Sequence, residues 1–186
     1  DRPFFLFLYI MDPHSDYRCP EPYHSRFDPD YRGRKEVEDG QMAFFAAEIL
    51  KGSESRLDRR DIEHFMALYD GEVAYADSEI GRLLKSLEKR NRLDETLVVL
   101  TSDHGEEFLE HGGVHHGYTL YNEVTRVPLV VRYPPQIPQS RVIDDRLVQS
   151  VDMAPTILEI AGIEKPAGMQ GESLMPLIRN SEASWR

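Results

Sequence analysis

Three runs of apolar residues, each as long as a β-strand, divide the chain. They are 4–10 (FFLFLYI), 96–101 (TLVVLT) and 127–133 (VPLVVRY). None of them alternates between apolar and polar positions, and such continuous runs are typical of strands buried on both faces, as in a parallel sheet. We therefore expect 4–10 to form a central, fully buried strand that lies parallel to 96–101.

The segment between the first two runs has helical periodicity. Its apolar residues recur at steps of three and four, which places them on one face of a helix: Phe65, Tyr69, Val73, Ala76, Ile80, Leu83 and Leu87. A second helix is predicted over about 35–50. A third is predicted over 152–160, with Asp152 as its N-cap and Gly162 just past its end.

The order strand, helix, strand, loop, strand, helix predicts an α/β sandwich with a mainly parallel sheet. In such folds ligands bind beyond the carboxyl ends of the strands. The polar segment 11–14 (MDPH) directly follows the first predicted strand, and 102–108 (SDHGEEF) directly follows the second. Both segments are thus expected at one edge of the sheet, where we look for the functional site.

Composition narrows the class of protein. The 186 residues carry a net charge of −11, which argues against a general nucleic-acid binder because a phosphate backbone would be repelled. No apolar run reaches the roughly 18 residues that cross a bilayer, so no membrane partner is expected. The run 4–10 lacks a basic leader and does not read as a signal peptide. A single cysteine excludes an internal disulfide.

A candidate metal-binding pair stands at the end of the second predicted strand. Asp103 and His104 offer a carboxylate and an imidazole that can ligate one divalent cation, and Gly105 lets the backbone turn tightly beside them. The alternative is a strand-end turn in which Asp103 merely caps the next segment of the chain.

Further histidines lie in the next loop. His111 and His115 have the i, i+4 spacing of a helical zinc site, but the two glycines between them favour a loop. With His116, they could instead present imidazoles to an anionic substrate, since a protonated imidazole donates to sulfate or phosphate oxygens. A plain solvated loop is the third possibility.

Other polar residues remain ambiguous from sequence alone. His14 is either structural or part of the same site, and Arg126 is either an ion-pair partner or an anion contact. The glutamates at 106, 107 and 110 are expected to form a mostly solvated face, from which one could support a histidine.

Four segments in this order resemble the sulfatase family of the alkaline phosphatase superfamily: 69–112, 115–134, 151–163 (VDMAPTILEIAGI) and 171–178 (GESLMPLI). The resemblance extends from about Phe4 to Ile178. It implies an alkaline phosphatase-like α/β/α sandwich. It also implies hydrolysis of sulfate esters, or of phosphate or phosphonate esters as in close relatives.

The resemblance also implies roles for particular residues. Asp103 and His104 match the second pair of metal ligands of the family. His14 matches a histidine that contacts the sulfuryl group or the leaving oxygen, and His116 lies where many members carry a substrate-contacting lysine or histidine. The expected site is therefore His14 and His116 for catalysis, His14, His115, His116 and Arg126 for substrate binding, and Asp103 and His104 for the metal.

Two family features are missing from these residues. The aspartate pair that completes the metal site is absent, and so is the Cys-x-Pro-x-Arg segment whose cysteine becomes the formylglycine nucleophile; Cys19 is followed by proline at the wrong offset. We therefore expect 1–186 to be part of a sulfatase catalytic domain, without the N-terminal nucleophile segment and most of the C-terminal subdomain. The N-terminal part of the same domain is then its expected partner.

The expected function is metal-dependent hydrolysis of a small-molecule or glycan sulfate ester. Calcium is the first choice of metal, with manganese close behind because imidazole at His104 suits softer ions. A phosphonate or phosphate ester hydrolase, a phosphoethanolamine transferase and a non-catalytic remnant of the fold are the alternatives. The family resemblance is compatible with an extracytoplasmic location, but the residues themselves do not indicate a compartment.

Overall fold

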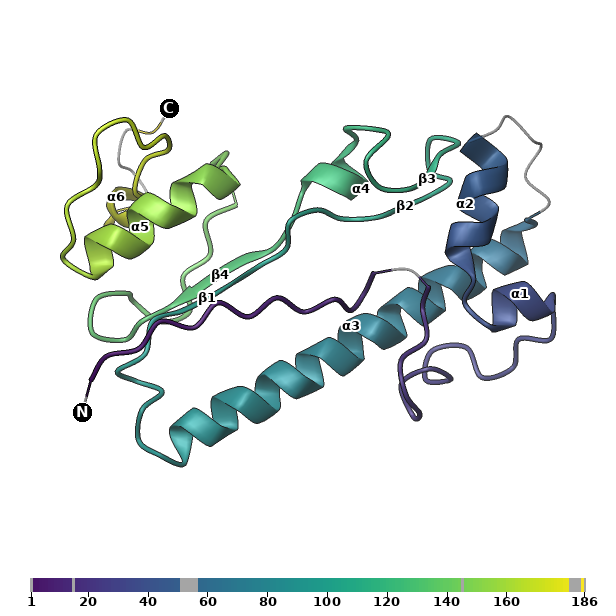
Figure 1. Cartoon of the computed structure of the whole chain (residues 1–186), viewed down its shortest axis with the longest axis horizontal. Helices are drawn as coiled ribbons and strands as arrows, with labels where there is room; N and C mark the ends of the chain where they lie inside the picture. The colour runs from purple at the N-terminus through teal and green to yellow at the C-terminus, as the bar shows by residue number, and fades with distance from the viewer. Residues whose placement is uncertain (1, 15, 51–56, 145, 181–184, 186) are drawn as a thin grey trace. The chain divides into compact units, whose positions relative to one another are not determined.

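The computed structural model describes residues 2–14, 16–50, 57–144, 146–180 and 185 (Figure 1). The chain forms two compact units, the first from 1–86 with 104–127 and the second from 87–103 with 128–186. The first unit contains α1 (Lys35–Glu38), α2 (Met42–Leu50), nearly all of α3 (Arg59–Glu88), β2 (Glu107–Phe108), β3 (Val114–His115) and α4 (Asn122–Thr125). The second contains β1 (Val98–Thr101), β4 (Leu129–Arg132), the 3-10 turn η1 (Ser150–Asp152), α5 (Met153–Ile160) and α6 (Met175–Arg179).

Helix α3 confirms the long helix that the periodicity predicts. A reciprocal capping box fixes its start, because the backbone N–H of Asp61 donates to the Asp58 carboxylate (2.9 Å) and that of Asp58 donates to the Asp61 carboxylate (3.1 Å). The helix ends at Glu88, and Asn91, just beyond this end, adopts a left-handed conformation (φ 53°). The buried face covers only its first half, from Asp61 to Glu72, whereas Val73 is 44% exposed.

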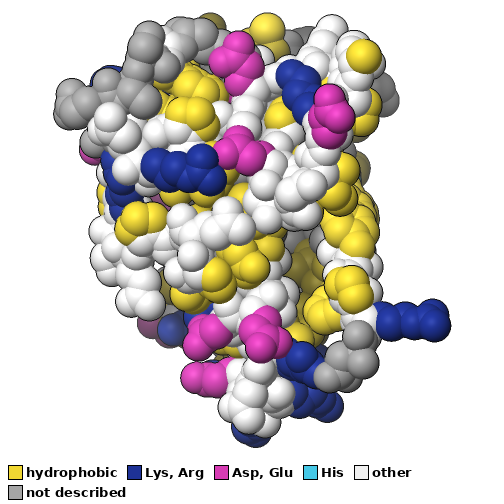
Figure 2. Space-filling model, turned by 90° about the vertical axis from the view of Figure 1, so that its left-hand side faces the viewer, with side chains coloured by type: hydrophobic (Ala, Val, Ile, Leu, Met, Phe, Trp, Pro, Cys, Tyr) yellow, Lys and Arg dark blue, Asp and Glu magenta, His cyan; other side chains and the backbone are white. Residues whose placement is uncertain are grey.

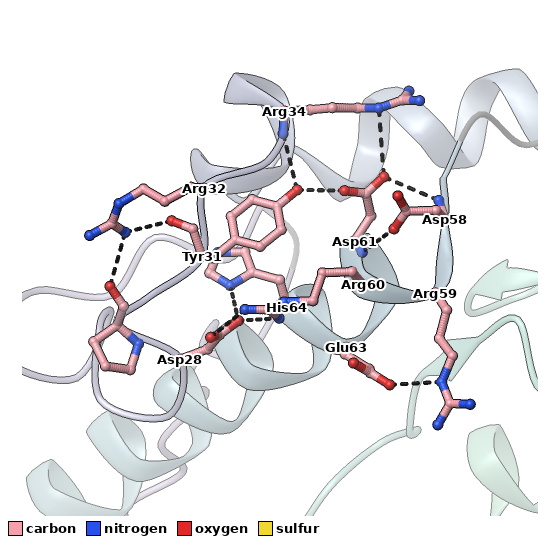
Figure 3. A network of polar contacts seen from close by, with 11 residues as sticks. Asp28, Tyr31, Arg32, Arg34, Asp58, Arg59, Arg60, Asp61, Glu63 and His64 are labelled. Atoms are coloured by element: carbon pink, nitrogen blue, oxygen red, sulfur yellow. Dashed lines mark hydrogen bonds and ion pairs between the residues drawn. The ribbon is translucent and has the colours of Figure 1, made fainter.

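A buried polar network joins the loop 28–34 to the start of α3 (Figure 3). The Tyr31 hydroxyl donates to the Asp61 carboxylate (2.5 Å). The Tyr31 ring also stacks on His64, at 3.9 Å between ring centroids. Asp28 accepts two hydrogen bonds from Arg60, at 2.6 and 2.7 Å, and lies 2.7 Å from His64 Nδ1. The first turn of α3 therefore holds this loop through several charged contacts.

The helix predicted over about 35–50 is interrupted. It divides into α1 and α2 at Gly40, whose φ is +68°. A Cβ at Gly40 would lie 2.1 Å from the carbonyl oxygen of Tyr17, so the chain approaches Tyr17 too closely for any side chain. Helical periodicity does not reveal such a close approach.

Aromatic residues form the centre of the first unit. Tyr17 is fully buried and packs against Phe65, Tyr69 and Phe108, with ring centroids 5.6 to 6.4 Å apart. Such edge and tilted contacts are favourable arrangements for aromatic rings. This core therefore connects the 17–19 segment to α3 and to the β2–β3 hairpin.

The expectation of a buried first strand is wrong for the described structure. Residues 4–10 form no strand, and Figure 1 shows them as an extended trace. Phe5 is 80% exposed and Phe7 is 77% exposed. A strand buried on both faces needs partners on both edges and layers on both faces. The described part of the chain gives this run no strand partner.

The strands of the second unit also differ from the expectation. β1 and β4 lie within the two other predicted runs, but they pair antiparallel, with Val98 opposite Arg132 and Thr101 opposite Leu129. The other described pair, β2 with β3, is antiparallel as well. The described strands therefore do not form the mainly parallel sheet that the apolar runs predicted. Within the described residues, no helix is both long and apolar enough to cross a membrane.

The predicted third helix is present as α5, with Gly162 in a left-handed conformation (φ 69°) just past its end. Asp152 is fully buried but does not cap α5 with its side chain. Its carboxylate accepts instead from the backbone N–H groups of Gln149 and Glu172, each at 2.9 Å. This residue therefore ties the segment before α6 to the start of α5.

Hydrophobic side chains remain exposed among charged ones on the face that Figure 2 shows.

Candidate active site

A short hairpin and the residues next to it carry His111, His115 and His116. β2 and β3 pair with Glu107 opposite His115 and Phe108 opposite Val114. Glu107 is buried and closes the connection, since its carboxylate accepts from the Gly113 N–H (3.2 Å) and from the Thr119 hydroxyl (2.7 Å). The loop is therefore held by its own glutamate, and the solvated role expected for Glu107 is wrong.

Four histidines converge beside this hairpin. His104 stacks on His116 at 3.8 Å between ring centroids, and the rings of His115 and His116 are 4.2 Å apart. His14 meets His115 and His116 edge-on, at 5.9 and 5.2 Å. His14 and His104, which follow the first and second predicted strands, thus both lie beside His116.

The backbone of His115 explains why two adjacent imidazoles point the same way. Successive residues of a strand project to opposite faces. His115 has φ of +74°, a left-handed conformation that is uncommon outside glycine, and it interrupts this alternation. Both rings consequently face the same carboxylate, that of Glu106.

Glu106 is the residue that sequence reasoning missed as an individual. It is 8% exposed, although a solvated face was expected, and it does support a histidine. One carboxylate oxygen lies 3.2 Å from His116 Nδ1 and 3.9 Å from His115 Nδ1, while the other accepts from the Tyr17 hydroxyl at 3.1 Å. Tyr17 is 89 positions away in sequence, so no local pattern signals this contact.

Burial dominates the electrostatics of this cluster. It raises the pKa of Glu106, an effect that His115 and the Tyr17 hydrogen bond partly oppose. Burial also lowers the pKa of His115, against the attraction of Glu106. The Tyr17 pKa is raised well above its usual range, first by burial and then by the Glu106 charge. At neutral pH, His115 is therefore a neutral lone-pair donor.

In the predicted metal pair, His104 is oriented so that one ring nitrogen can bind a cation. Its Nδ1 lies 2.9 Å from the carbonyl oxygen of Gly105, which can only accept, so Nδ1 carries the proton and Nε2 presents a lone pair. Metal-ligating histidines commonly have this arrangement. Gly105 is required here because a Cβ would lie 2.1 Å from the Glu123 carbonyl oxygen. Asp103 is exposed and belongs to the second unit, so its place beside the histidines stays a prediction.

Two residues of the expected set lie apart. His111 pairs with Glu123 at 3.2 Å and stacks on Tyr121, which removes it from a shared site with His115. Arg126 is the exposed C-cap of α4, and no described hydrogen bond, ion pair or ring contact joins its side chain to the histidines. Its expected contact with substrate stays a prediction.

Cys19 has the properties of an inert cysteine. It is buried, and burial together with Glu72 raises the pKa of its thiol to about 11. Reactive cysteines have lowered pKa values and partial exposure. Cys19 therefore does not have the properties of a catalytic nucleophile.

Comparison with known protein families assigns this chain to one of them. The sulfatase family model matches residues 1–163, so the chain belongs to the sulfatase family. Its similarity extends to particular curated proteins. It is 33% identical to the multifunctional alkaline phosphatase superfamily protein PehA of Trinickia caryophylli, over all of this chain and 39% of that protein. It is 40% identical to an N-acetylglucosamine-6-O-sulfatase of Bacteroides thetaiotaomicron, over 67% of this chain and 22% of that protein.

Solved structures show the same likeness. The phosphonate monoester hydrolase of Agrobacterium radiobacter matches all of this chain and 40% of its own, with 27% identity and a TM-score of 0.82. A structure in complex with D-glucosamine-2-N,6-O-disulfate matches 92% of this chain and 37% of its own, with 32% identity and a TM-score of 0.60. The fold is thus of the alkaline phosphatase-like kind, and these neighbours are hydrolases and sulfatases. The chain spans two fifths or less of each of these proteins.

Proposed function

We propose that this chain supplies part of the active site of a metal-dependent sulfate ester hydrolase. The observation that carries the proposal is the convergence of His14, His104, His115 and His116 around one buried carboxylate in a chain of the sulfatase family. Clustered imidazoles are suited to binding an anionic ester and to moving protons near neutral pH.

In this proposal each group has a distinct role. Asp103 and His104 would hold a divalent ion, which would supply Lewis-acid chemistry at the ester when bound. His14 and His116 bind the ester oxygens and give a proton to the leaving alcohol. His115 and Arg126 add contacts to the anion. The formylglycine nucleophile and the remaining ligands come from residues outside 1–186.

Calcium stays the first choice of ion, and manganese the second. Calcium is bound by six or more oxygens, whereas imidazole suits first-row transition metals. The substrate class is a small-molecule or glycan sulfate ester, which agrees with the N-acetylglucosamine-6-O-sulfatase among the relatives. A phosphonate ester is the second candidate, favoured by His104 and by the likeness to phosphonate monoester hydrolases.

The test compares two polypeptides. Residues 1–186 alone, and the same residues joined to a family N-terminal segment, are assayed with an aryl sulfate and an aryl phosphonate ester, in calcium and in manganese. We expect turnover only from the joined polypeptide, because covalent catalysis needs an activated nucleophile at the metal. Asp103→Ala should abolish both calcium binding at the predicted pair and turnover, while His111→Ala, on the same loop but outside the cluster, should leave both. Turnover by 1–186 alone would contradict the proposed division of the site.

A further inference from the structure

Three potential ligand atoms converge beside the hairpin. Glu106, His115 and His116 each offer one ligand atom, and these atoms all lie within 4.8 Å of one another. A tetrahedral ion with bonds of about 2.0 to 2.1 Å has its ligand atoms roughly 3.4 Å apart. The measured separations from the Glu106 oxygen, 3.2 Å to His116 Nδ1 and 3.9 Å to His115 Nδ1, are close to this value.

The fold keeps these groups enclosed and oriented. The Glu106 side chain is 4% exposed, and those of His115 and His116 are 17% and 18% exposed. The second oxygen of Glu106 is fixed by the buried Tyr17 hydroxyl at 3.1 Å. A ligating carboxylate that is itself held by a hydrogen bond is typical of metal centres.

The charge balance also favours a cation. The described side chains in contact with the Glu106 carboxylate are the Tyr17 hydroxyl and the imidazoles of His115 and His116. None of them carries a permanent positive charge, in contrast to Asp28, which pairs with Arg60. A bound divalent ion would balance the Glu106 carboxylate and use imidazole lone pairs at the same time.

We propose that Glu106, His115 and His116 form a binding site for a first-row transition-metal ion of the zinc class, separate from the Asp103–His104 pair. Two imidazole nitrogens and one carboxylate oxygen are a donor set that zinc prefers and calcium does not. His14, whose ring centroid is 5.2 Å from that of His116, is the nearest candidate for a fourth ligand. This site does not rest on the proposed hydrolysis, because His115 and His116 would bind this ion in place of the direct ester contacts that the proposed function gives them.

The test is a titration of purified 1–186 with Co²⁺, followed by its visible absorption, which distinguishes four-coordinate from six-coordinate ions. Zn²⁺ is then added in competition. We expect a four-coordinate spectrum that Zn²⁺ abolishes. Glu106→Gln, which can still accept from Tyr17, and His116→Asn should each weaken Co²⁺ binding by at least about tenfold.

Two controls assign the ion to these residues. Asp103→Asn removes a ligand of the predicted pair, and His111→Asn removes a loop histidine outside the cluster; both should keep the Co²⁺ spectrum. Circular dichroism checks that each variant is folded, and His116→Asn alters a side chain outside the aromatic core. Loss of the spectrum in Asp103→Asn alone, or a folded chain that binds neither Co²⁺ nor Zn²⁺, would overturn the proposal. Failure of ester hydrolysis would leave this titration unaffected.

Discussion

Two buried carboxyl groups of the first unit have different surroundings. Glu106 faces histidines, whereas Glu72 of α3 forms a hydrogen bond with Asp12 and accepts from the backbone N–H groups of Arg18 and Cys19. Burial, followed by the Asp12 contact, raises the Glu72 pKa from 4.5 to about 7. The fold therefore favours the protonated form of Glu72, so the stability of the folded chain depends on pH.

Replacing Glu72 by glutamine should consequently stabilise the chain in a pH-dependent way. Unfolded glutamic acid loses its proton near 4.5 and the folded group near 7. The contribution of this group is thus most favourable below about pH 4.5 and declines as the pH rises to about 7. Glu72→Gln removes the decline, so its melting temperature should exceed that of the parent at pH 8 and approach it at pH 5. Thermal unfolding followed by circular dichroism measures both; an equal difference at the two pH values would argue against a titrating Glu72.

The structure brings four histidines of the expected site together, while their roles stay predictions. The histidines at 14, 104, 115 and 116 were identified because each follows a predicted strand or lies in the adjacent loop. Glu106 was assigned to a solvated face, since its burial depends on Tyr17, 89 positions earlier in the chain. A contact between residues so far apart in the sequence produces no local periodicity or spacing from which it could be predicted.

At the level of elements, the start of α3 has the densest set of polar contacts described. Asp61 takes part in the capping box, accepts from the Tyr31 hydroxyl and lies 3.6 Å from Arg34 Nε. It is 3% exposed, so its carboxylate cannot turn to water without local opening. The loop 28–34 and the first turn of α3 should therefore lose stability together.

Asp61→Ala tests this coupling. It removes the N3 carboxylate and the acceptor of the buried Tyr31 hydroxyl, so we expect a loss of about 2–4 kcal/mol in the free energy of unfolding. Glu63→Ala is the matched control, because Glu63 pairs with Arg59 on an exposed surface and should change stability by less than about 0.5 kcal/mol. Urea denaturation of both variants measures the difference; equal effects would mean that the network adds nothing beyond a surface pair.

Element prediction depended on which partners the sequence can reveal. Periodicity identified α3, and the end signals at Asp152 and Gly162 identified α5, because a helix satisfies its own backbone and its start and stop are marked locally. The break at Gly40 depends on the carbonyl of Tyr17, and the direction of β1 depends on its pairing with β4. Apolar runs indicate where strands lie but contain no information on whether neighbouring strands run parallel or antiparallel.

For the molecule as a whole, the exposed apolar run 4–9 is the main departure from an ordinary surface. Six consecutive large side chains are each more than half exposed: Phe4, Phe5, Leu6, Phe7, Leu8 and Tyr9. Contiguous exposed apolar segments with strand-forming composition are sites of self-association. The sequence predicted that this run is buried, but the described residues leave it exposed.

Replacing Phe5 and Phe7 by lysine should thus reduce aggregation of residues 1–186. We expect the concentration at which light scattering begins to rise at least about twofold, because charge interrupts such segments. Phe27→Lys is the control, since Phe27 is exposed but lies outside the run. The melting temperature of the double variant should not fall, as these side chains have little packing to lose. If Phe27→Lys gives the same gain, net charge and not the run would account for it.

Tyr17 belongs both to the aromatic core and to the histidine cluster, through one ring and one hydroxyl. Position 17 therefore serves the packing of the core and the orientation of Glu106 at the same time. A change that fills the core better but lacks the hydroxyl would release Glu106, and a change that keeps a polar group but is smaller would open the core. Directed evolution of this chain toward new ligands should therefore leave position 17 unchanged and accumulate its substitutions in the surrounding loops, where the two demands are separate.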